Sequence, residues 1–129
     1  MLVRNLMQCP EFLAGDSTLL RELLHPDKEA LQLRYSLAHA TVGPGDTSLN
    51  HRLRVSEVYY ILEGRGAMRI DGEERAVEPG DAVYIPPRST QCIHNPGPGD
   101  LKFLCIVDPA WRPEHEEVLP GAEGRDPVR

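Results

Sequence analysis

The chain has 129 residues and a formal net charge of −6 at pH 7, and this length fits one domain with a single hydrophobic core. It carries no basic stripe interleaved with aromatic residues, which excludes the usual nucleic-acid-binding surface. No apolar stretch is long enough to span a bilayer, and the three cysteines form no Cys-x-x-Cys pair that would indicate a disulfide framework. We therefore expect a soluble, cytoplasmic protein without a nucleic-acid or membrane partner.

Glycine and proline residues recur throughout the sequence. The 11 glycines and 12 prolines lie between short apolar runs, which is typical of an all-β protein with many tight turns. Near the N-terminus the local signal differs, because the four leucines of residues 18–24 have helical spacing and Asp16 or Ser17 could act as the N-cap. Local propensity thus predicts a helix over these residues.

Residues 32–42 alternate as a strand does. Tyr35 and His39 share one face with Leu33 and Leu37, and the other face carries Arg34, Ser36, Ala38 and Ala40. His39 would reach the interior only if its face is the inner one. A Gly-Pro-Gly-Asp turn at residues 43–46 ends this strand.

The next stretch presents polar side chains with strand spacing. His51 and Leu53 share a parity, and Glu57 shares a face with Tyr59 and Ile61. Two neighbouring strands would therefore offer an imidazole and a carboxylate to the same interior space. The Gly-Arg-Gly sequence at residues 64–66 predicts a hairpin before the next strand.

The rest of the chain continues as short strands separated by turn residues. We predict strands at residues 67–70, 73–77, 82–85, 90–94 and 101–107. His94 has the parity opposite to Gln91 and is expected to point away from His51. Trp111 is expected to pack a short tail back onto the sheet, and the residues after Pro120 are expected to be mobile.

Two groups of residues carry a family resemblance. The first resembles the opening cupin motif, G-x5-H-x-H-x3/4-E-x6-G, and its matching positions are Gly45, His51, Glu57 and Gly64. The second resembles the closing cupin motif, G-x5-P-x-G-x2-H-x3-N, and its matching positions are Gly80, Pro86 and Asn95. Three positions depart from the motifs: Leu53 and Gln91 stand where the family has histidines, and Arg88 replaces a glycine.

The resemblance implies a double-stranded β-helix, the jelly-roll barrel of small single-domain cupins of the group described as similar to mannose-6-phosphate isomerase. It assigns residues 31–107 to the barrel, residues 1–30 to an N-terminal arm with an early strand, and residues 108–129 to a C-terminal tail. It also favours a strand over a helix at residues 18–24. In this interpretation the fold overrides local propensity.

The same resemblance implies a candidate metal site. His51, Glu57 and Gln91 occupy three of the four positions that hold a metal in many cupins. One imidazole, one carboxylate and one amide oxygen suit Mn or Fe better than Zn, with Ni also considered. The alternative is that the replacement of two histidines by Leu53 and Gln91 has removed the metal site. His51, Glu57 and Gln91 would then form a hydrogen-bonded polar cluster without a metal.

The candidate catalytic pair is His51 and Glu57, which could act together as a general base without metal. Tyr59, Gln91 and Tyr35 could contact a substrate, although both tyrosines also fit an ordinary half-buried core position. Arg88 lies near the expected barrel rim and could attract an anion. His25 and His115 belong to terminal segments and are expected to be solvated.

Two functions remain open from the sequence. The first is a small-molecule enzyme of isomerase or epimerase type acting on a polar or sugar-derived metabolite, with dioxygenase chemistry less favoured because the site supplies only one histidine. The second is a non-catalytic ligand-binding or metal-free module. Val58, Tyr60 and Leu62 are apolar on the face opposite Glu57, which predicts a homodimer packed through that face.

Overall fold

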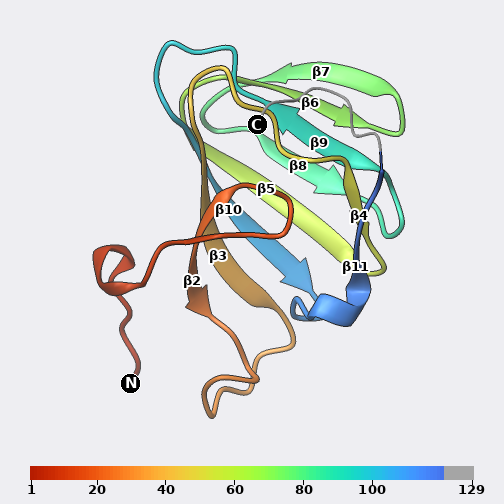
Figure 1. Cartoon of the computed structure of the whole chain (residues 1–129). Helices are drawn as coiled ribbons and strands as arrows, with labels where there is room; N and C mark the ends of the chain where they lie inside the picture. Colours follow the sequence, from red (N-terminus) through yellow and green to blue (C-terminus); the bar gives the residue numbers. More distant parts are fainter. Residues whose placement is uncertain (121–129) are drawn as a thin grey trace.

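The computed structural model describes residues 1–120, so the predicted mobility after Pro120 concerns residues outside the described part of the chain. Two antiparallel sheets enclose the interior, and the all-β prediction is confirmed (Figure 1). The described residues contain no helix of the length and apolarity needed to cross a membrane. Their only helical segments are two 3-10 turns, Leu6–Gln8 and Pro113–His115.

The first sheet has six strands in the order β1-β2-β3-β10-β5-β8. Its members are β1 (Phe12–Leu13), β2 (Leu19–Leu24), β3 (Ser36–Val42), β10 (Leu101–Asp108), β5 (Ser56–Glu63) and β8 (Ala82–Ile85). The second sheet has five strands in the order β11-β4-β9-β6-β7. Its members are β11 (Glu116–Val118), β4 (His51–Leu53), β9 (Gln91–His94), β6 (Gly66–Ile70) and β7 (Glu73–Val77).

The leucine-rich segment near the N-terminus is strand β2, as the cupin resemblance predicts. It pairs antiparallel with β3, and Leu20 lies opposite Ala40. Leu20 packs against the buried core. Pairing with β3 supplies backbone hydrogen bonds and a buried face, and these outweigh the helical spacing of the leucines.

The expected hairpin at residues 64–66 is wrong. Strand β5 belongs to the six-stranded sheet and β6 to the five-stranded sheet, so this turn carries the chain across the barrel. Gly64 has a φ of +82°, and a Cβ atom there would lie 2.4 Å from the carbonyl oxygen of Asp100. The glycine is therefore required by a close backbone approach as well as by its φ angle. The next turn, Asp71-Gly72, does form the predicted two-residue hairpin between β6 and β7.

The hydrophobic core lies between the two sheets. Tyr59 of β5 and Phe103 of β10 meet with ring centroids 4.3 Å apart and planes tilted by 34°. Ile61 and Ile93 from opposite sheets are fully buried in the same cluster. The inward faces predicted for β5 are thus confirmed, since Glu57, Tyr59 and Ile61 are all buried.

The tail returns to the barrel, as predicted from Trp111. The Trp111 amide donates a hydrogen bond to the Ser36 hydroxyl at 2.9 Å. Strand β11 then pairs with β4, and Glu116 lies opposite Leu53. This pairing brings an acidic residue from near the C-terminus to the open end of the barrel.

His25 corrects one expectation, because it is buried rather than solvated. Its Nε2 atom lies 2.6 Å from the carbonyl oxygen of Trp111, and its Nδ1 atom accepts from the Asp27 amide at 3.0 Å. The connection between β2 and β3 packs against the tail and encloses the ring. His25 therefore acts as a structural link between the two terminal regions of the chain.

Candidate functional site

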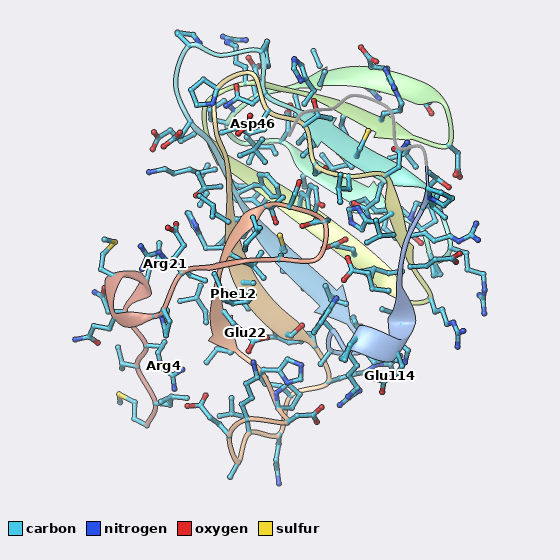
Figure 2. All side chains as sticks on the ribbon, viewed as in Figure 1. Arg4, Phe12, Arg21, Glu22, Asp46 and Glu114 are labelled. Carbon is cyan, nitrogen blue, oxygen red and sulfur yellow. The ribbon has the colours of Figure 1, made fainter. Side chains whose placement is uncertain are left out.

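A cavity of about 240 Å³ opens between the sheets. Residues of both sheets, the N-terminal arm and the returning tail line it. Phe12 and Glu22, labelled in Figure 2, come from the paired strands β1 and β2, and both belong to this lining. The cavity also receives His51 and Glu57, so the predicted convergence of an imidazole and a carboxylate takes place.

These two residues reach the cavity from opposite sides. His51 begins β4 in one sheet and Glu57 belongs to β5 in the other. The two strands are therefore not the neighbours that the sequence predicts, but belong to different sheets. Facing sheets bring the two side chains together across the interior instead.

His51 is held in one orientation by the backbone. Its Nδ1 atom lies 2.8 Å from the carbonyl oxygen of Leu49. Because a carbonyl can only accept, Nδ1 carries the proton, and the neutral ring then offers the Nε2 lone pair to the cavity. That Nε2 atom lies 3.5 Å from Oδ2 of Asp16.

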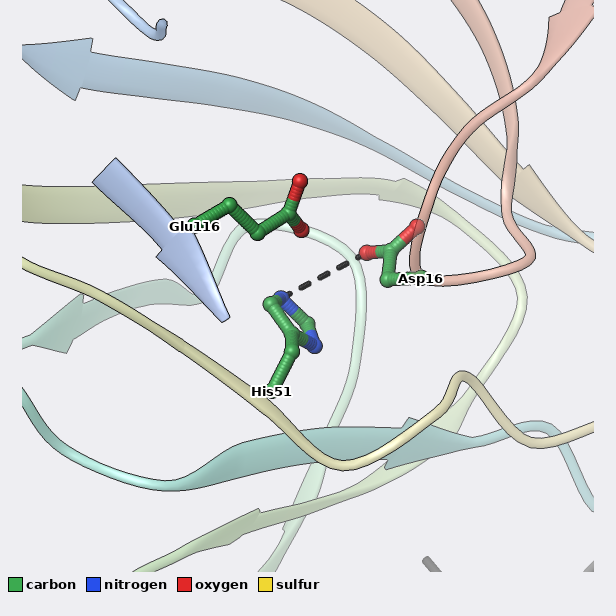
Figure 3. A group of neighbouring side chains, drawn as sticks. All are labelled: Asp16, His51 and Glu116. Carbon is green, nitrogen blue, oxygen red and sulfur yellow. Dashed lines mark ion pairs between the residues drawn. The ribbon is translucent and has the colours of Figure 1, made fainter. Parts of the chain in front are cut away.

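Asp16 comes from the turn between β1 and β2. Its Oδ1 atom accepts hydrogen bonds from the Thr18 amide at 3.1 Å and the Thr18 hydroxyl at 2.8 Å. The Leu49 amide donates to the Asp16 carbonyl at 2.8 Å and anchors the turn on the barrel. These contacts leave Oδ2 directed at His51, as Figure 3 shows.

Glu116 completes a group of three. Ligand atoms of Asp16, His51 and Glu116 all lie within 4.8 Å of one another (Figure 3). Burial and the charge of Asp16 raise the pKa of Glu116, while His51 and a hydrogen bond from the Trp111 side chain act in the opposite direction. The tail thus places the carboxylate of Glu116 where it repels the carboxylate of Asp16.

The donor set of this triad fits a divalent cation. One imidazole nitrogen and two carboxylates are ligand types that Mn, Fe(II) and catalytic Zn sites use. Two ionised carboxylates would balance the charge of the cation, and the Nδ1 contact of His51 is the outer-shell bond that ligating histidines usually make. This group shares only His51 with the set expected from the cupin motifs.

Glu57 and Gln91, the other two residues of that expected set, bind each other. The Gln91 amide nitrogen donates to Oε1 of Glu57 at 2.9 Å, and the Tyr59 hydroxyl donates to Oε1 of Gln91 at 2.9 Å. Strand pairing sets Gln91 directly opposite His51. The structure therefore brings His51, Glu57, Tyr59 and Gln91 into one buried region.

Burial shifts the protonation of this region. Desolvation raises the pKa of Glu57 to about 7, although His51 and the Gln91 hydrogen bond oppose the shift. For His51, burial lowers the pKa, but the charges of Asp16 and Glu57 outweigh it and the net direction is upward. Protons therefore bind this cluster more tightly than they bind the same side chains in water.

Tyr35 does not join the site. Ser36 and Ala38 line the cavity, so the inner face of this segment has the opposite parity to Tyr35, which is 39% exposed. His39 shares the parity of Tyr35 and lines a separate surface depression instead of the cavity. Their shared face is thus the outer one.

Two further expectations concern residues outside the cavity. His94 points away from His51, as its parity predicts, and its Nδ1 atom lies 2.7 Å from the Thr47 hydroxyl. Arg88, with a φ of +69°, lines a separate pocket together with Arg52 and Arg54 rather than the cavity.

Sequence reasoning missed Asp16 and Glu116 as site residues. The sequence marks Asp16 only as a possible helix cap, and it does not single out Glu116. Neither belongs to a motif of fixed spacing, since each reaches His51 through long-range strand pairing. The sole local signal is the Asp-x-Thr sequence at residues 16–18, which favours a turn stabilised by the aspartate side chain.

Comparisons with known proteins agree with this architecture. The chain is 42% identical over 109 residues to the uncharacterized protein MJ1618 of Methanocaldococcus jannaschii, covering 84% of this chain and 86% of the relative. It is 30% identical over 82 residues to an oxalate-binding protein of Thermotoga maritima, covering 62% and 68% of the two chains.

A solved structure supports the fold. The crystal structure of a cupin 2 conserved barrel domain protein from Salinispora arenicola superposes with a TM-score of 0.74 at 23% identity, covering 88% of this chain and 91% of that one. The family model described as the cupin domain matches residues 38–107, more than half of the sequence. The two-sheet barrel, the motif positions and these matches together show that the chain belongs to the cupin family.

Proposed function

We propose that this cupin binds a divalent cation through Asp16, His51 and Glu116 and uses it to hold a small metabolite in the adjoining cavity. The observation that carries the proposal is the convergence of the three ligand atoms within 4.8 Å, with the His51 ring fixed so that Nε2 faces the two carboxylates. When bound, such a cation polarises a ligand oxygen and stabilises negative charge that develops on it.

Glu57 is the residue best suited to move a proton in this cavity. It lines the cavity beside the triad, and the Gln91 amide holds its Oε1 atom. A carboxyl group with a pKa of about 7 can both accept and donate a proton near neutral pH. These features support proton-transfer chemistry of isomerase or epimerase type on a metabolite with a polar head group, with His51 as a metal ligand.

The alternative is a binding module without catalysis. Gln91 forms hydrogen bonds with both Glu57 and Tyr59, and this arrangement also fits a buried cluster with a purely structural role. The similarity to a protein described as oxalate-binding favours this alternative, because that description names binding alone. A binding module that uses a cation would hold it at the same triad, whereas a metal-free module would not need the triad.

The proposal also covers the cellular location and the assembly of the protein. A cytoplasmic location is supported by Cys9 and Cys105, which are buried thiols outside any disulfide, as expected in a reducing compartment. A homodimer is supported by the exposed Tyr60, Leu62 and Tyr84, which lie together on the outer face of β5 and β8.

The test measures the metal directly. Purified protein stripped with a chelator is titrated with Mn²⁺, Fe²⁺, Ni²⁺ and Zn²⁺ while bound metal and melting temperature are recorded. We expect one equivalent of metal and a higher melting temperature in the wild type, and loss of both in the Asp16→Asn and Glu116→Gln variants. Glu117→Gln is the matched control, because Glu117 follows Glu116 on β11 but is exposed and paired with Arg52.

Metal bound with equal affinity by the wild type and both triad variants would contradict the assignment. Absence of metal from the wild type would contradict the whole proposal. To separate the two functions, the ligand found by a melting-temperature screen is incubated with metal-loaded protein in D₂O. Deuterium entering the ligand in the wild type but not in Glu57→Gln supports proton transfer, and no incorporation in either supports binding alone.

A further inference from the structure

The cavity lining combines two kinds of chemistry. One part is acidic and contains the triad with Glu57. The other part is apolar, and its main members are Phe12, Leu13, Leu20, Phe103 and Trp111. A ligand that fills this space must therefore have a polar group that suits the acidic part and a hydrocarbon body that packs against the apolar part.

The charges of the lining limit the charge of the ligand. Four carboxyl groups line the cavity, and they belong to Asp16, Glu22, Glu57 and Glu116. Among the described residues that line the cavity, Lys28 is the only lysine or arginine, and it forms an ion pair with Glu22. A divalent cation would already be balanced by two ionised carboxylates of the triad. Any negative charge on the ligand would then be in excess, and a dianion such as oxalate or phosphate would bring two such charges to a lining whose lysine is already paired.

The apolar wall limits the shape of the ligand. The Tyr59 hydroxyl is engaged with Gln91, and the Tyr59 ring stacks against Phe103, so this side of the cavity presents mainly carbon. A sugar buried here would leave several hydroxyl groups without partners, and each such loss is costly. The volume of 240 Å³ lies below the usual range of roughly 300–1,000 Å³ for ligand pockets, which favours a body no larger than one ring.

We propose that the natural ligand is a small, single-ring or similarly compact apolar molecule that carries one oxygen-based chelating group and no more than one negative charge. This inference rests on the proposed metal site and names the ligand class for it. The chelating group binds the cation at Asp16, His51 and Glu116. The apolar body lies against Phe12 and the other apolar lining residues, Leu13, Leu20, Phe103 and Trp111.

Salicylate and oxalate provide a matched pair of probes. Both offer two oxygen donors, but salicylate carries one charge and a ring, and oxalate carries two charges and no ring. Each is titrated by calorimetry into Mn²⁺-loaded protein and into metal-free protein, with bound Mn²⁺ measured first in every sample. We expect salicylate to bind the loaded wild type at least tenfold more tightly than oxalate, and to lose that affinity without Mn²⁺ or in Asp16→Asn.

Variants of the wall test the apolar contact separately. Phe12→Ala and Leu13→Ala remove exposed side chains of β1 that line the cavity, so the barrel core is untouched. Each is expected to weaken salicylate binding several-fold and to leave Mn²⁺ affinity unchanged. Tyr84→Ala, on the outer face of the barrel, is the control and should change neither.

The outcomes separate this inference from the metal assignment. If Mn²⁺ binds at the triad but oxalate binds as tightly as salicylate, or salicylate does not bind, the ligand class is wrong and the metal site stands. If salicylate binds equally well without Mn²⁺, the chelating contact is wrong. If the wild type binds no Mn²⁺, the metal site and the ligand class that depends on it both fail.

Discussion

Asp16 and His51 face each other inside the open end of the barrel, with Oδ2 of Asp16 3.5 Å from Nε2 of His51. One residue belongs to the turn after β1 and the other begins β4, so the contact joins the N-terminal arm to the five-stranded sheet. Glu116 approaches the same ring from the C-terminal strand. Without a cation, two carboxylates and an imidazole share a buried space, and the raised pKa values of His51 and Glu116 couple the ionisation of these two groups to folding.

This coupling predicts that the metal-free protein becomes less stable as the pH rises. Glu57 has a folded pKa of about 7 against an ordinary value of 4.5, so the folded state holds its proton longer than the unfolded chain does. The raised pKa of His51 acts in the same direction, because the stability it contributes is lost as the pH rises through its folded value. By linkage the free energy of unfolding falls between about pH 5 and pH 8.

Glu57→Gln should remove much of this dependence. The amide keeps the shape and accepts the Gln91 hydrogen bond but never ionises. In chelator, we expect the variant to exceed the wild type at pH 8 by about 1–3 kcal/mol, and to lose that advantage at pH 5. Urea unfolding at several pH values measures this difference. Parallel profiles for the two proteins would show that Glu57 does not hold its proton in the folded state.

Most of the fold could be predicted from the sequence because its signals are local or belong to family motifs. Turn residues separate the strands, and the inward face of β5 follows from the alternation around Glu57 and Tyr59. The assignment of β2 as a strand required the family resemblance, since its leucines fit a helix. The mistaken hairpin at residues 64–66 has a physical cause: turn chemistry shows that the chain reverses, but not which sheet the next strand joins.

The site could be predicted only in part. Motif spacing predicts His51, Glu57 and Gln91, and the structure brings these three residues together. Asp16 and Glu116 could not be found, because their positions depend on how the arm and the tail pair with distant strands. The alternation of residues 32–42 does not reveal which of its two faces is the inner one, so it could not show that Tyr35, just before β3, lies outside the cavity.

The turn at residues 64–66, where the chain passes from one sheet to the other, gives a stability prediction with an internal control. Gly64 and Gly72 both have φ above +80°, but only at Gly64 would a Cβ atom meet backbone, the Asp100 carbonyl oxygen at 2.4 Å. Gly72→Ala should cost about 1 kcal/mol for the left-handed conformation alone. Gly64→Ala should cost about 3 kcal/mol or more, because the backbone must also move. Equal losses in urea unfolding would mean that the approach of Asp100 is not constrained.

Leu53 offers a test of the metal position by gain of a ligand. It is buried in the cavity lining, shares its face with His51, and stands where the cupin motif has a second histidine. Leu53→His should raise Ni²⁺ and Zn²⁺ affinity by about tenfold or more, since an added imidazole suits these ions. It should also lower the stability of the metal-free protein by about 1–3 kcal/mol, because a polar group replaces a buried apolar one.

Metal titration followed by competition with a chelator measures this affinity. Leu62→His is the control, because Leu62 lies on the outer face and is 42% exposed. Unchanged affinity in a folded Leu53→His protein would place the cation out of reach of residue 53, and the triad assignment would need revision.

The outer face of the six-stranded sheet gives the last prediction, which concerns assembly. Tyr60, Leu62 and Tyr84 are exposed on β5 and β8, and Tyr84 is exposed by 62%. Leu104 and Ile106 of β10 lie opposite Tyr60 and Val58 on the same face, so the apolar surface continues across three strands. An apolar face of this kind is best covered by a second copy of the same face. Tyr84→Arg should weaken a homodimer at least tenfold, because two buried guanidinium groups would be desolvated without partners.

Sedimentation velocity over a range of protein concentrations measures this change. Glu73→Arg, which places the same side chain on exposed β7 of the other sheet, should leave the dimer intact. A wild type that sediments as a monomer at every concentration would contradict the dimer. A dimer that Tyr84→Arg leaves unchanged would show that the two copies meet through another face, and the apolar strands β5, β8 and β10 would then need a different partner.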